Sequence, residues 1–276
     1  MLRTALFLAL VGCPKPPPVE TAVPPAPIPR DDVMAVVWTQ TSAENDAVAL
    51  TVFRSARMAL DLALADPTWT AAVEQTGELA GLVPAIVVDV DETVLDNSPY
   101  QARLVRDGGH FEKATWGAWV DEAAAKPIPG AAAFLSDAKA RGVDVFYVSN
   151  RDVSQEEATR ANLAALGFPD AETLEHLRFR PADGDRSKTA RRLEIEKTHR
   201  IVMMFGDNLF DFMEAEAPDL PARDGIVTDH AEWWGTRWFM LPNPMYGSWD
   251  DAVLSYTHPD ASAAHEARVE ALDPAR

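Results

Sequence analysis

Two aspartates one residue apart follow a run of β-forming residues in the stretch IVVDVDETVLDNSP, residues 86–99. Asp89 and Asp91 repel each other at close range unless something nearby neutralises them. A carboxylate can attack phosphorus and form an aspartyl-phosphate, which divides one hard hydrolysis into two easier steps. A second carboxylic acid can protonate the leaving alkoxide and then activate water as a general base. The spacing of Asp89 and Asp91 therefore suits phosphoryl transfer.

Further polar groups follow later apolar runs of the chain. Ser149 and Asn150 follow one run, and Asp207 and Asp211 follow another, while Lys188 begins a predicted helix between them. Clustered carboxylates beside a phosphate dianion require a hard cation, and ligands that are all oxygen favour Mg²⁺. We predict that Mg²⁺ lies between Asp89, Asp91 and Asp207, and that it acts with Lys188 to neutralise charge on the phosphoryl oxygens. Each group alone has an ordinary explanation as a turn, a helix cap or a solvated side chain.

Strands that alternate with helices must position these groups. Short, continuous apolar runs are typical of buried parallel strands, and they occur at residues 86–90, 144–149 and 200–206, with a fourth at 237–242. Between them, residues 130–141 and 154–166 have helical character, and Ser154 and Glu157 are spaced as a capping box. The alternation predicts an α/β fold with a doubly wound, mainly parallel sheet. Ligands bind beyond the carboxyl ends of such strands, which is where the polar groups fall.

Composition divides the chain into segments. The start, MLRTALFLALVGC, resembles a lipoprotein signal peptide with Cys13 as the acylated residue, and a chance apolar start with a free thiol is the alternative. The Pro-rich stretch that follows is typical of an extended spacer. We therefore expect a signal peptide, a linker, an α/β domain with a smaller helical subdomain inside it, and a C-terminal tail: residues 1–12, 13–31, 32–256 (subdomain from 32–80 and 97–128) and 257–276.

Charge limits the choice of partners. The 276 residues carry a net charge of -18, which disfavours nucleic-acid polymers and anionic membrane surfaces. A membrane contact is therefore expected through a lipid anchor only. A phosphate-bearing ligand needs local positive charge on such a protein. The single cysteine excludes an internal disulfide and a cysteine-based metal site.

The joint motif resembles the haloacid dehalogenase superfamily. The pattern of that superfamily is DxD, then Ser or Thr, then Lys, then GDxxxD. More narrowly, the chain resembles the class C (lipoprotein-type) acid phosphatases, which include bacterial outer-membrane 5′-nucleotidases. The matching text is VDVDETVLDNSPY, FYVSNR, RSKTARR, FGDNLFDF and LPNPMYGSW, with WTQTSAENDA and the region from WGAWV to KPIPGA. One departure is Asn45, where the family usually has an aromatic residue.

The resemblance implies a role for each matching residue. Asp89 corresponds to the nucleophile and Asp91 to the general acid and base. The backbone carbonyl of Asp91 and the carboxylates of Asp89 and Asp207 would bind Mg²⁺, with Asp211 holding its waters. Ser149 and Asn150 would bind the phosphate, and Lys188 would bridge it to Asp89. The family surrounds the substrate's base with an aromatic pair, and Trp116 and Tyr246 occupy the matching text, although core packing explains either one nearly as well.

These observations favour a Mg²⁺-dependent acid phosphatase for small phosphomonoesters, with 5′-nucleotides, meaning nucleoside monophosphates, as the expected substrates. The alternatives are a broad or sugar-phosphate phosphatase without nucleobase preference and a non-catalytic, ligand-binding surface lipoprotein. We expect the protein to be lipid-anchored in a bacterial cell envelope, at the outer membrane. The sequence leaves the oligomeric state open, with a homodimer as one option.

Overall fold

The computed structural model describes residues 30–182 and 184–275. The expected signal peptide, Cys13 and almost all of the Pro-rich linker lie outside the described residues. Among the helices of the described part, none is both long and apolar enough to cross a bilayer.

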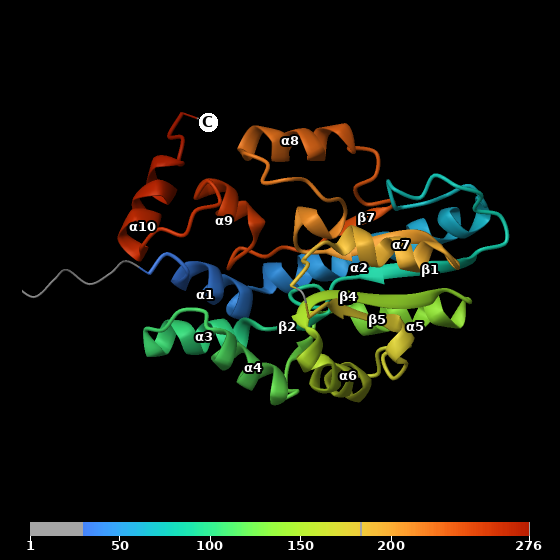
Figure 1. The fold of residues 1–276 in the computed structure, drawn as a ribbon, viewed down its shortest axis with the longest axis horizontal. Helices are drawn as coiled ribbons and strands as arrows, with labels where there is room; N and C mark the ends of the chain where they lie inside the picture. Colours follow the sequence, from blue (N-terminus) through green and yellow to red (C-terminus); the bar gives the residue numbers. More distant parts are fainter. Residues whose placement is uncertain (1–29, 183, 276) are drawn as a thin grey trace, which may run out of the picture.

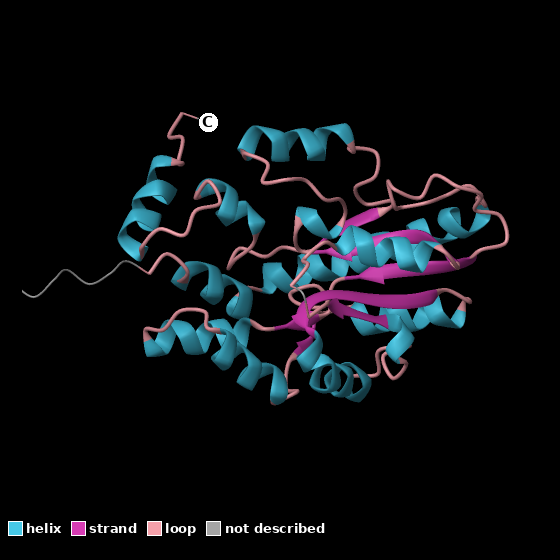
Figure 2. Ribbon diagram, viewed as in Figure 1, coloured by secondary structure: helices cyan, strands magenta, loops and turns pink. Residues whose placement is uncertain are grey.

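A five-stranded parallel sheet forms the centre of the fold (Figures 1 and 2). Its order across the sheet is β5 (Leu177–Arg180), β4 (Asp144–Asp152), β1 (Val83–Val88), β6 (His199–Gly206) and β7 (Trp238–Met240). All four neighbouring pairs are parallel. The α/β fold with a mainly parallel sheet is therefore confirmed, and the four strands predicted from apolar runs are present. The sequence did not indicate β5, because its four residues, LRFR, alternate between apolar and charged.

Helices cover both faces of this sheet. On one face, α2 (Ala43–Ala65) and α5 (Ala131–Ala140) pack against β4, β6 and β7, with α6 (Glu156–Ala165) beside β5. On the other face, α7 (Lys188–Glu196) packs against β4 and β6. Figure 1 shows α5 and α7 on opposite sides of the strands. The two layers bury separate apolar clusters, so both faces of β1 are dry: Ile86 and Val88 belong to one cluster, Ala85 and Val87 to the other. This explains why the strand sequences are apolar without interruption.

A group of helices lies at one end of the molecule (Figure 1, left). Its members are α1 (Val33–Thr41), α3 (Ser98–Asp107), α4 (Lys113–Asp121), α9 (Ser248–Val253) and α10 (Ala261–Glu270). The helix α8 (Leu220–Asp229) precedes α9 in the chain. A two-stranded antiparallel pair, β2 (Leu95–Asp96) with β3 (Lys126–Pro127), joins the two ends of the segment that carries α3 and α4. The sequence predicts residues 32–80 within the helical subdomain; α1 lies in this group beside α3, whereas α2 covers the sheet. Its buried face meets β6, β7 and α5.

The C-terminal segment is not a simple tail. Arg268 of α10 pairs with Asp31 at 2.9 Å and with Asp250 at 2.7 Å, which ties this helix to the start of the described chain.

Asn45, the position at which the sequence departs from the family pattern, has no aromatic ring to bury. Its side-chain amide donates to the carbonyl of Thr39 at 3.2 Å and so joins α1 to α2.

The prediction of a capping box at Ser154 and Glu157 is wrong. A short 3₁₀ turn, Val153–Gln155, comes before α6. The Gln155 side chain accepts the backbone N–H of Asp152 at 3.0 Å, so the box begins two residues earlier than the sequence pattern suggested.

Candidate active site

Asp89 lies at the carboxyl end of the central strand. Its backbone N–H donates to the carbonyl of Phe205 at 3.0 Å, which continues the pairing of β1 with β6 by one residue. The carboxylate is buried and contacts the Lys188 ammonium, which also lies 2.6 Å from Asp211 Oδ1. Lys188 can reach this place because α7 begins there, capped by Ser187, whose hydroxyl accepts from the N–H of Ala190 at 3.4 Å. The fold thus brings together residues 99 positions apart.

Three carboxylates gather around this ammonium. Asp89, Asp207 and Asp211 each offer an oxygen, and these atoms lie within 4.8 Å of one another. Burial raises the pKa of Asp89 to about 7, and the neighbouring Asp211 and Asp91 act in the same direction, while Lys188 opposes them. Burial, followed by the charges of Asp211 and Asp89, raises the pKa of Asp207 well above its usual range. One ammonium does not balance three clustered carboxylates, two of them buried, and an all-oxygen donor set fits a hard divalent metal ion.

Gly206 allows Asp211 to approach the end of β6. A Cβ at position 206 would lie 2.2 Å from Asp211 Oδ2, a separation that atoms cannot adopt. The same Asp211 oxygen accepts the backbone N–H of Asn208 at 2.9 Å across a 3₁₀ turn, Leu209–Asp211. Gly206, followed by Asp207 and Asn208, therefore lets the chain fold back so that Asp211 lies against the end of β6.

The loop after β7 forms another wall of the site. Asn243 Nδ2 donates to Asp207 Oδ2 at 2.7 Å, and the Tyr246 hydroxyl contacts Glu92 Oε2. Glu92 is buried in a left-handed backbone conformation, with φ of 55°, and its Oε1 accepts the N–H of Asn97 at 2.8 Å. Burial, with the charges of Asp91 and Asp207, raises its pKa well above the usual range. Sequence reasoning gave no role to Glu92 or Asn243.

Ser149 and Asn150 lie at the end of β4 beside a buried arginine that sequence reasoning missed. Arg191 donates to the Ser149 carbonyl at 2.5 Å and to Asn150 Oδ1 at 2.6 Å. Because that oxygen is engaged, the amide nitrogen of Asn150 is the group left to face a ligand. Burial lowers the pKa of Arg191. Arg191 could have been found from the sequence, since it lies three residues after Lys188 and so shares its helix face.

Asp91 is held by a second buried arginine. Arg151 Nη2 lies 2.8 Å from Asp91 Oδ1, and Arg151 Nε lies 3.0 Å from the same oxygen. The Asn97 amide donates to that oxygen as well, at 2.8 Å. Arg151 follows Ser149 by two residues on β4, so the period of the strand places both side chains on one face. Together with Lys188 and Arg191, it supplies the local positive charge that a phosphate ligand needs on an acidic protein.

The two aromatic candidates come from different segments of the chain and contact different residues of this site. Trp116, on α4, is half-buried, and the Arg151 guanidinium carbon lies 5.5 Å from the centre of its ring. Its ring also meets Tyr100 edge-on, with 5.2 Å between the ring centres. Tyr246 is half-buried and bound to Glu92, as described above. Within the described part of the chain, no ring contact joins Trp116 to Tyr246.

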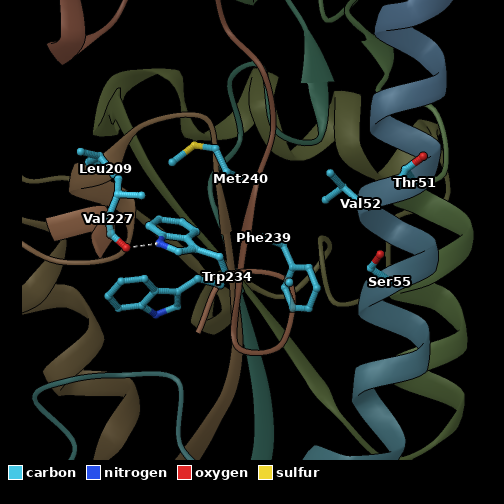
Figure 3. A pocket seen from close by; sticks show the side chains of 10 residues that line it. Thr51, Val52, Ser55, Leu209, Val227, Trp234, Phe239 and Met240 are labelled. Carbon is cyan, nitrogen blue, oxygen red and sulfur yellow. Dashed lines mark hydrogen bonds between the residues drawn. The ribbon is translucent and has the colours of Figure 1, made fainter. Parts of the chain in front are cut away.

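A separate apolar cavity of about 400 Å³ lies between α2, β7 and the residues that follow β6 (Figure 3). Phe239 and Met240 contribute from β7 and Val52 from α2, while the Trp234 indole donates to the Val227 carbonyl at 3.1 Å. None of the predicted site residues lines it. The chemistry-bearing groups therefore converge elsewhere, beyond the carboxyl ends of β1, β4 and β6.

This fold and this site define a member of the haloacid dehalogenase superfamily. Residues 20–249 match the profile of that superfamily's subfamily IIIB, described as acid phosphatase, and the chain belongs to this family. The resemblance noted in the sequence is thereby confirmed, and it extends to the narrower class.

Solved structures and characterised proteins give the same placement. The class C acid phosphatase from Bacillus anthracis is 36% identical and superimposes with a TM-score of 0.79, covering 88% of this chain and 96% of that one. A second structure of that enzyme, with tungstate bound, gives the same values. Acid phosphatase 1 of Solanum lycopersicum is 28% identical over 167 residues, and the stem 31 kDa glycoprotein of Glycine max is 27% identical over 164. The matched region spans 57% and 58% of the length of these two plant proteins.

Proposed function

We propose that the protein is a Mg²⁺-dependent acid phosphatase that hydrolyses small phosphomonoesters through an aspartyl-phosphate. The observation that carries this proposal is the buried contact of Lys188 with both Asp89 and Asp211, inside a cluster of three carboxylates at the end of β1. An ammonium in that position holds a nucleophilic carboxylate in place and offers charge to the oxygens of an incoming phosphoryl group. The relative with tungstate bound supports an oxyanion site in this fold, because tungstate has the tetrahedral shape of phosphate.

Each side chain then has a defined task. Asp89 attacks phosphorus, while Asp91 gives a proton to the leaving oxygen and later takes one from water. Asn150, with its oxygen fixed by Arg191, presents its N–H groups to the phosphate beside the Ser149 hydroxyl. The carboxylates of Asp89 and Asp207 and the backbone carbonyl of Asp91 are the groups that would hold the metal ion, with Asp211 close enough to hold its waters. When bound, Mg²⁺ offsets the charge that builds up on the phosphoryl oxygens.

The proposed substrates are 5′-nucleotides, recognised by stacking of the base on Trp116 and Tyr246. Each stack contributes roughly 1–3 kcal/mol and discriminates little between bases. The half-buried state of both rings supports this, since a fully buried ring could not meet a ligand. The alternative within enzymes is a broad or sugar-phosphate phosphatase. The contact of Tyr246 with Glu92 favours this alternative if the contact serves only to hold the Tyr246 ring in the fold.

A non-catalytic surface lipoprotein is the alternative from another class. A protein of that kind has no need of a nucleophile or of a cation to support one. Asp89, Asp91, Asp207 and Lys188 are all present, and Asp89, Asp207 and Lys188 are brought together in one cluster. This arrangement supports the enzyme rather than the binding protein.

We also propose that the mature protein is anchored by a lipid on Cys13 at the outer membrane of a bacterial cell envelope. The support is the sequence of the first 29 residues, which lie outside the described residues. The profile match begins at residue 20, after the expected anchor.

The test of the proposed activity is release of inorganic phosphate from a panel of nucleotides and sugar phosphates, with and without a chelator. We expect release from nucleoside monophosphates, its loss after chelation and its return when Mg²⁺ is added. Equal release from every ester would support the broad phosphatase, and no release from any of them under metal-loaded conditions would favour the binding protein.

A further inference from the structure

The carboxylate of Asp91 is bound unequally at its two oxygens. Oδ1 accepts from Asn97 Nδ2 at 2.8 Å and from two nitrogens of Arg151, at 2.8 and 3.0 Å. From the residues that the structure describes, Oδ2 receives only one long contact, 3.3 Å from Arg151 Nε. Each carboxylate oxygen has about two acceptor sites, so three donors leave no lone pair of Oδ1 free. A proton on this carboxyl group can therefore reside on Oδ2 alone.

The donors that fill Oδ1 are themselves fixed. The Arg151 side chain is 2% exposed, and its Nη1 donates to Thr159 Oγ1 at 2.9 Å. The guanidinium also lies over the ring of Trp116, as noted above. Asn97 is fully buried, and its Oδ1 accepts the indole N–H of Trp119 at 2.8 Å, which orients its amide nitrogen toward Asp91. A planar guanidinium held at several points presents its N–H groups in one direction only.

We propose that Arg151 is a positioning residue that reserves Asp91 Oδ2 as the oxygen that gives and takes the proton. This inference rests on the proposed phosphatase function. In the first step an Asp89 oxygen forms a bond to phosphorus, and the ester P–O bond breaks with its electron pair moving to the ester oxygen. That oxygen takes the proton from Asp91 Oδ2 and leaves as the alcohol. In the second step water attacks phosphorus and gives a proton back to Oδ2, while the bond to Asp89 breaks and returns its electron pair to the carboxylate.

Positioning of this proton matters most for esters with strongly basic leaving groups. An alkoxide cannot leave at a useful rate without a proton, whereas p-nitrophenolate is weakly basic and leaves without one. General acid catalysis contributes about 10²- to 10⁴-fold, and a misplaced group loses a large part of that. Loss of Arg151 should therefore lower kcat/KM by a larger factor for the ester with the more basic leaving group. A purely structural role for Arg151 would lower both values equally.

The experiment compares kcat/KM for benzyl phosphate and for p-nitrophenyl phosphate, two aromatic esters of similar size, in the full chain loaded with Mg²⁺. In Arg151→Lys we expect the benzyl phosphate value to fall about 30- to 100-fold, and the p-nitrophenyl phosphate value to fall less than about fivefold, since lysine keeps the charge but lacks the fork. Arg57→Lys is the matched control, because Arg57 is an exposed arginine of α2 that pairs with Asp137 of α5. Equal losses for both esters, or no loss for either, would overturn the proposal.

A second pair of variants keeps the test decisive if Arg151→Lys folds poorly. Thr159→Val removes the hydroxyl that accepts from Arg151 Nη1, whereas Thr159→Ser keeps it. We expect Thr159→Val to lower benzyl phosphate turnover selectively by about threefold to tenfold, with Thr159→Ser near wild type. An equal effect of the two variants would contradict the inference. Failure of the phosphatase proposal itself would look different, because wild type would then hydrolyse neither ester.

Discussion

The side-chain amide of Asn243 lies 2.7 Å from Asp207 Oδ2. Asn243 belongs to the loop after β7, whereas Asp207 follows β6, so this bond fixes one oxygen of Asp207 from outside its own strand end. An oxygen of Asp207 also lies within 4.8 Å of carboxylate oxygens of Asp89 and Asp211. A ligand that binds there should therefore meet a carboxylate that is already oriented.

Binding of Mg²⁺ should stabilise the folded protein measurably. A ligand at about 100 times its Kd stabilises by about 2.7 kcal/mol, which corresponds to a Tm increase of roughly 5–10 °C for a domain of this size. We expect this shift for wild type and for Asp61→Asn, an exposed aspartate that pairs with Arg141. It should be absent in Asp207→Asn. Calorimetry with and without Mg²⁺ decides the matter, and a full shift in Asp207→Asn would exclude the acidic cluster as the metal site.

Asp89 should be indispensable for turnover and dispensable for folding. An amide cannot attack phosphorus as a carboxylate does, so Asp89→Asn should lower phosphate release by at least about a thousandfold. Its Tm should be retained or rise slightly, because one of the buried negative charges is removed while Lys188 keeps Asp211 as a partner. Near-normal activity of the purified variant would refute an aspartyl-phosphate mechanism.

Base stacking can be separated from structural roles by comparing AMP with ribose 5-phosphate, which has the same type of leaving group and no base. If Trp116 stacks on the base, Trp116→Ala should lower kcat/KM about tenfold for AMP, with little change for ribose 5-phosphate. Tyr246→Phe keeps the ring and loses the contact with Glu92, so it should retain the preference that Tyr246→Ala loses. Parallel losses for both substrates would show that the rings are structural.

Glu196 should make stability depend on pH. Burial, followed by the charge of Glu74, raises its pKa to about 7 from an ordinary value near 4.5. Within residues 30–182 and 184–275, neither Glu74 Oε2 nor Glu196 Oε1 has a hydrogen-bond partner. The folded state therefore binds more protons than the unfolded state between these pH values, and the free energy of unfolding falls as pH rises from about 4.5 through 7. Glu196→Gln should reduce this fall, because Asp89, whose pKa is raised to about 7 as well, still contributes. The variant should be more stable than wild type at pH 8, but not at pH 4.5.

The matched control for that measurement is Glu194→Gln on the same helix. Its carboxylate is exposed and pairs with Lys197 at 2.5 Å, so the variant should follow the wild-type pH dependence. Denaturant unfolding at pH 4.5, 6 and 8 provides the comparison. An identical pH profile for Glu196→Gln and wild type would contradict the assignment.

Lipid attachment at Cys13 should decide whether the protein partitions with membranes. Each buried CH₂ contributes about 0.8 kcal/mol, and several acyl chains anchor stably where one does not. Cys13→Ser should therefore move the protein from the detergent phase to the aqueous phase in a phase-partition assay, without loss of phosphatase activity. Equal detergent partitioning of the two proteins would rule the anchor out.

The positions of the catalytic candidates could be predicted because parallel strands place their carboxyl ends at one edge. Asp89 and Asp207 each follow a buried strand directly, and Ser149 lies near the end of another, so the strand pattern already located them. Their proposed roles came from the family resemblance instead. Asp211 was expected at the site from its spacing, and the close contact that Gly206 permits accounts for its position.

The partners of those residues could not be predicted in the same way. Arg151 and Asp91 are 60 positions apart, and no local periodicity signals that their side chains meet. The place of α2 was missed for a related reason, since an amphipathic pattern shows that one face is buried but not what covers it. Contacts of this kind depend on the packing of whole elements against one another.

Gly206 also sets a limit for engineering. Replacement of glycine by alanine is a common route to thermostable variants, because it reduces the freedom of the unfolded chain where the native backbone suits either residue. At this position the added methyl group would collide with the Asp211 carboxylate. A consensus or library design that treats Gly206 as an ordinary strand glycine would therefore exchange a small entropic gain for a displaced acidic group at the site.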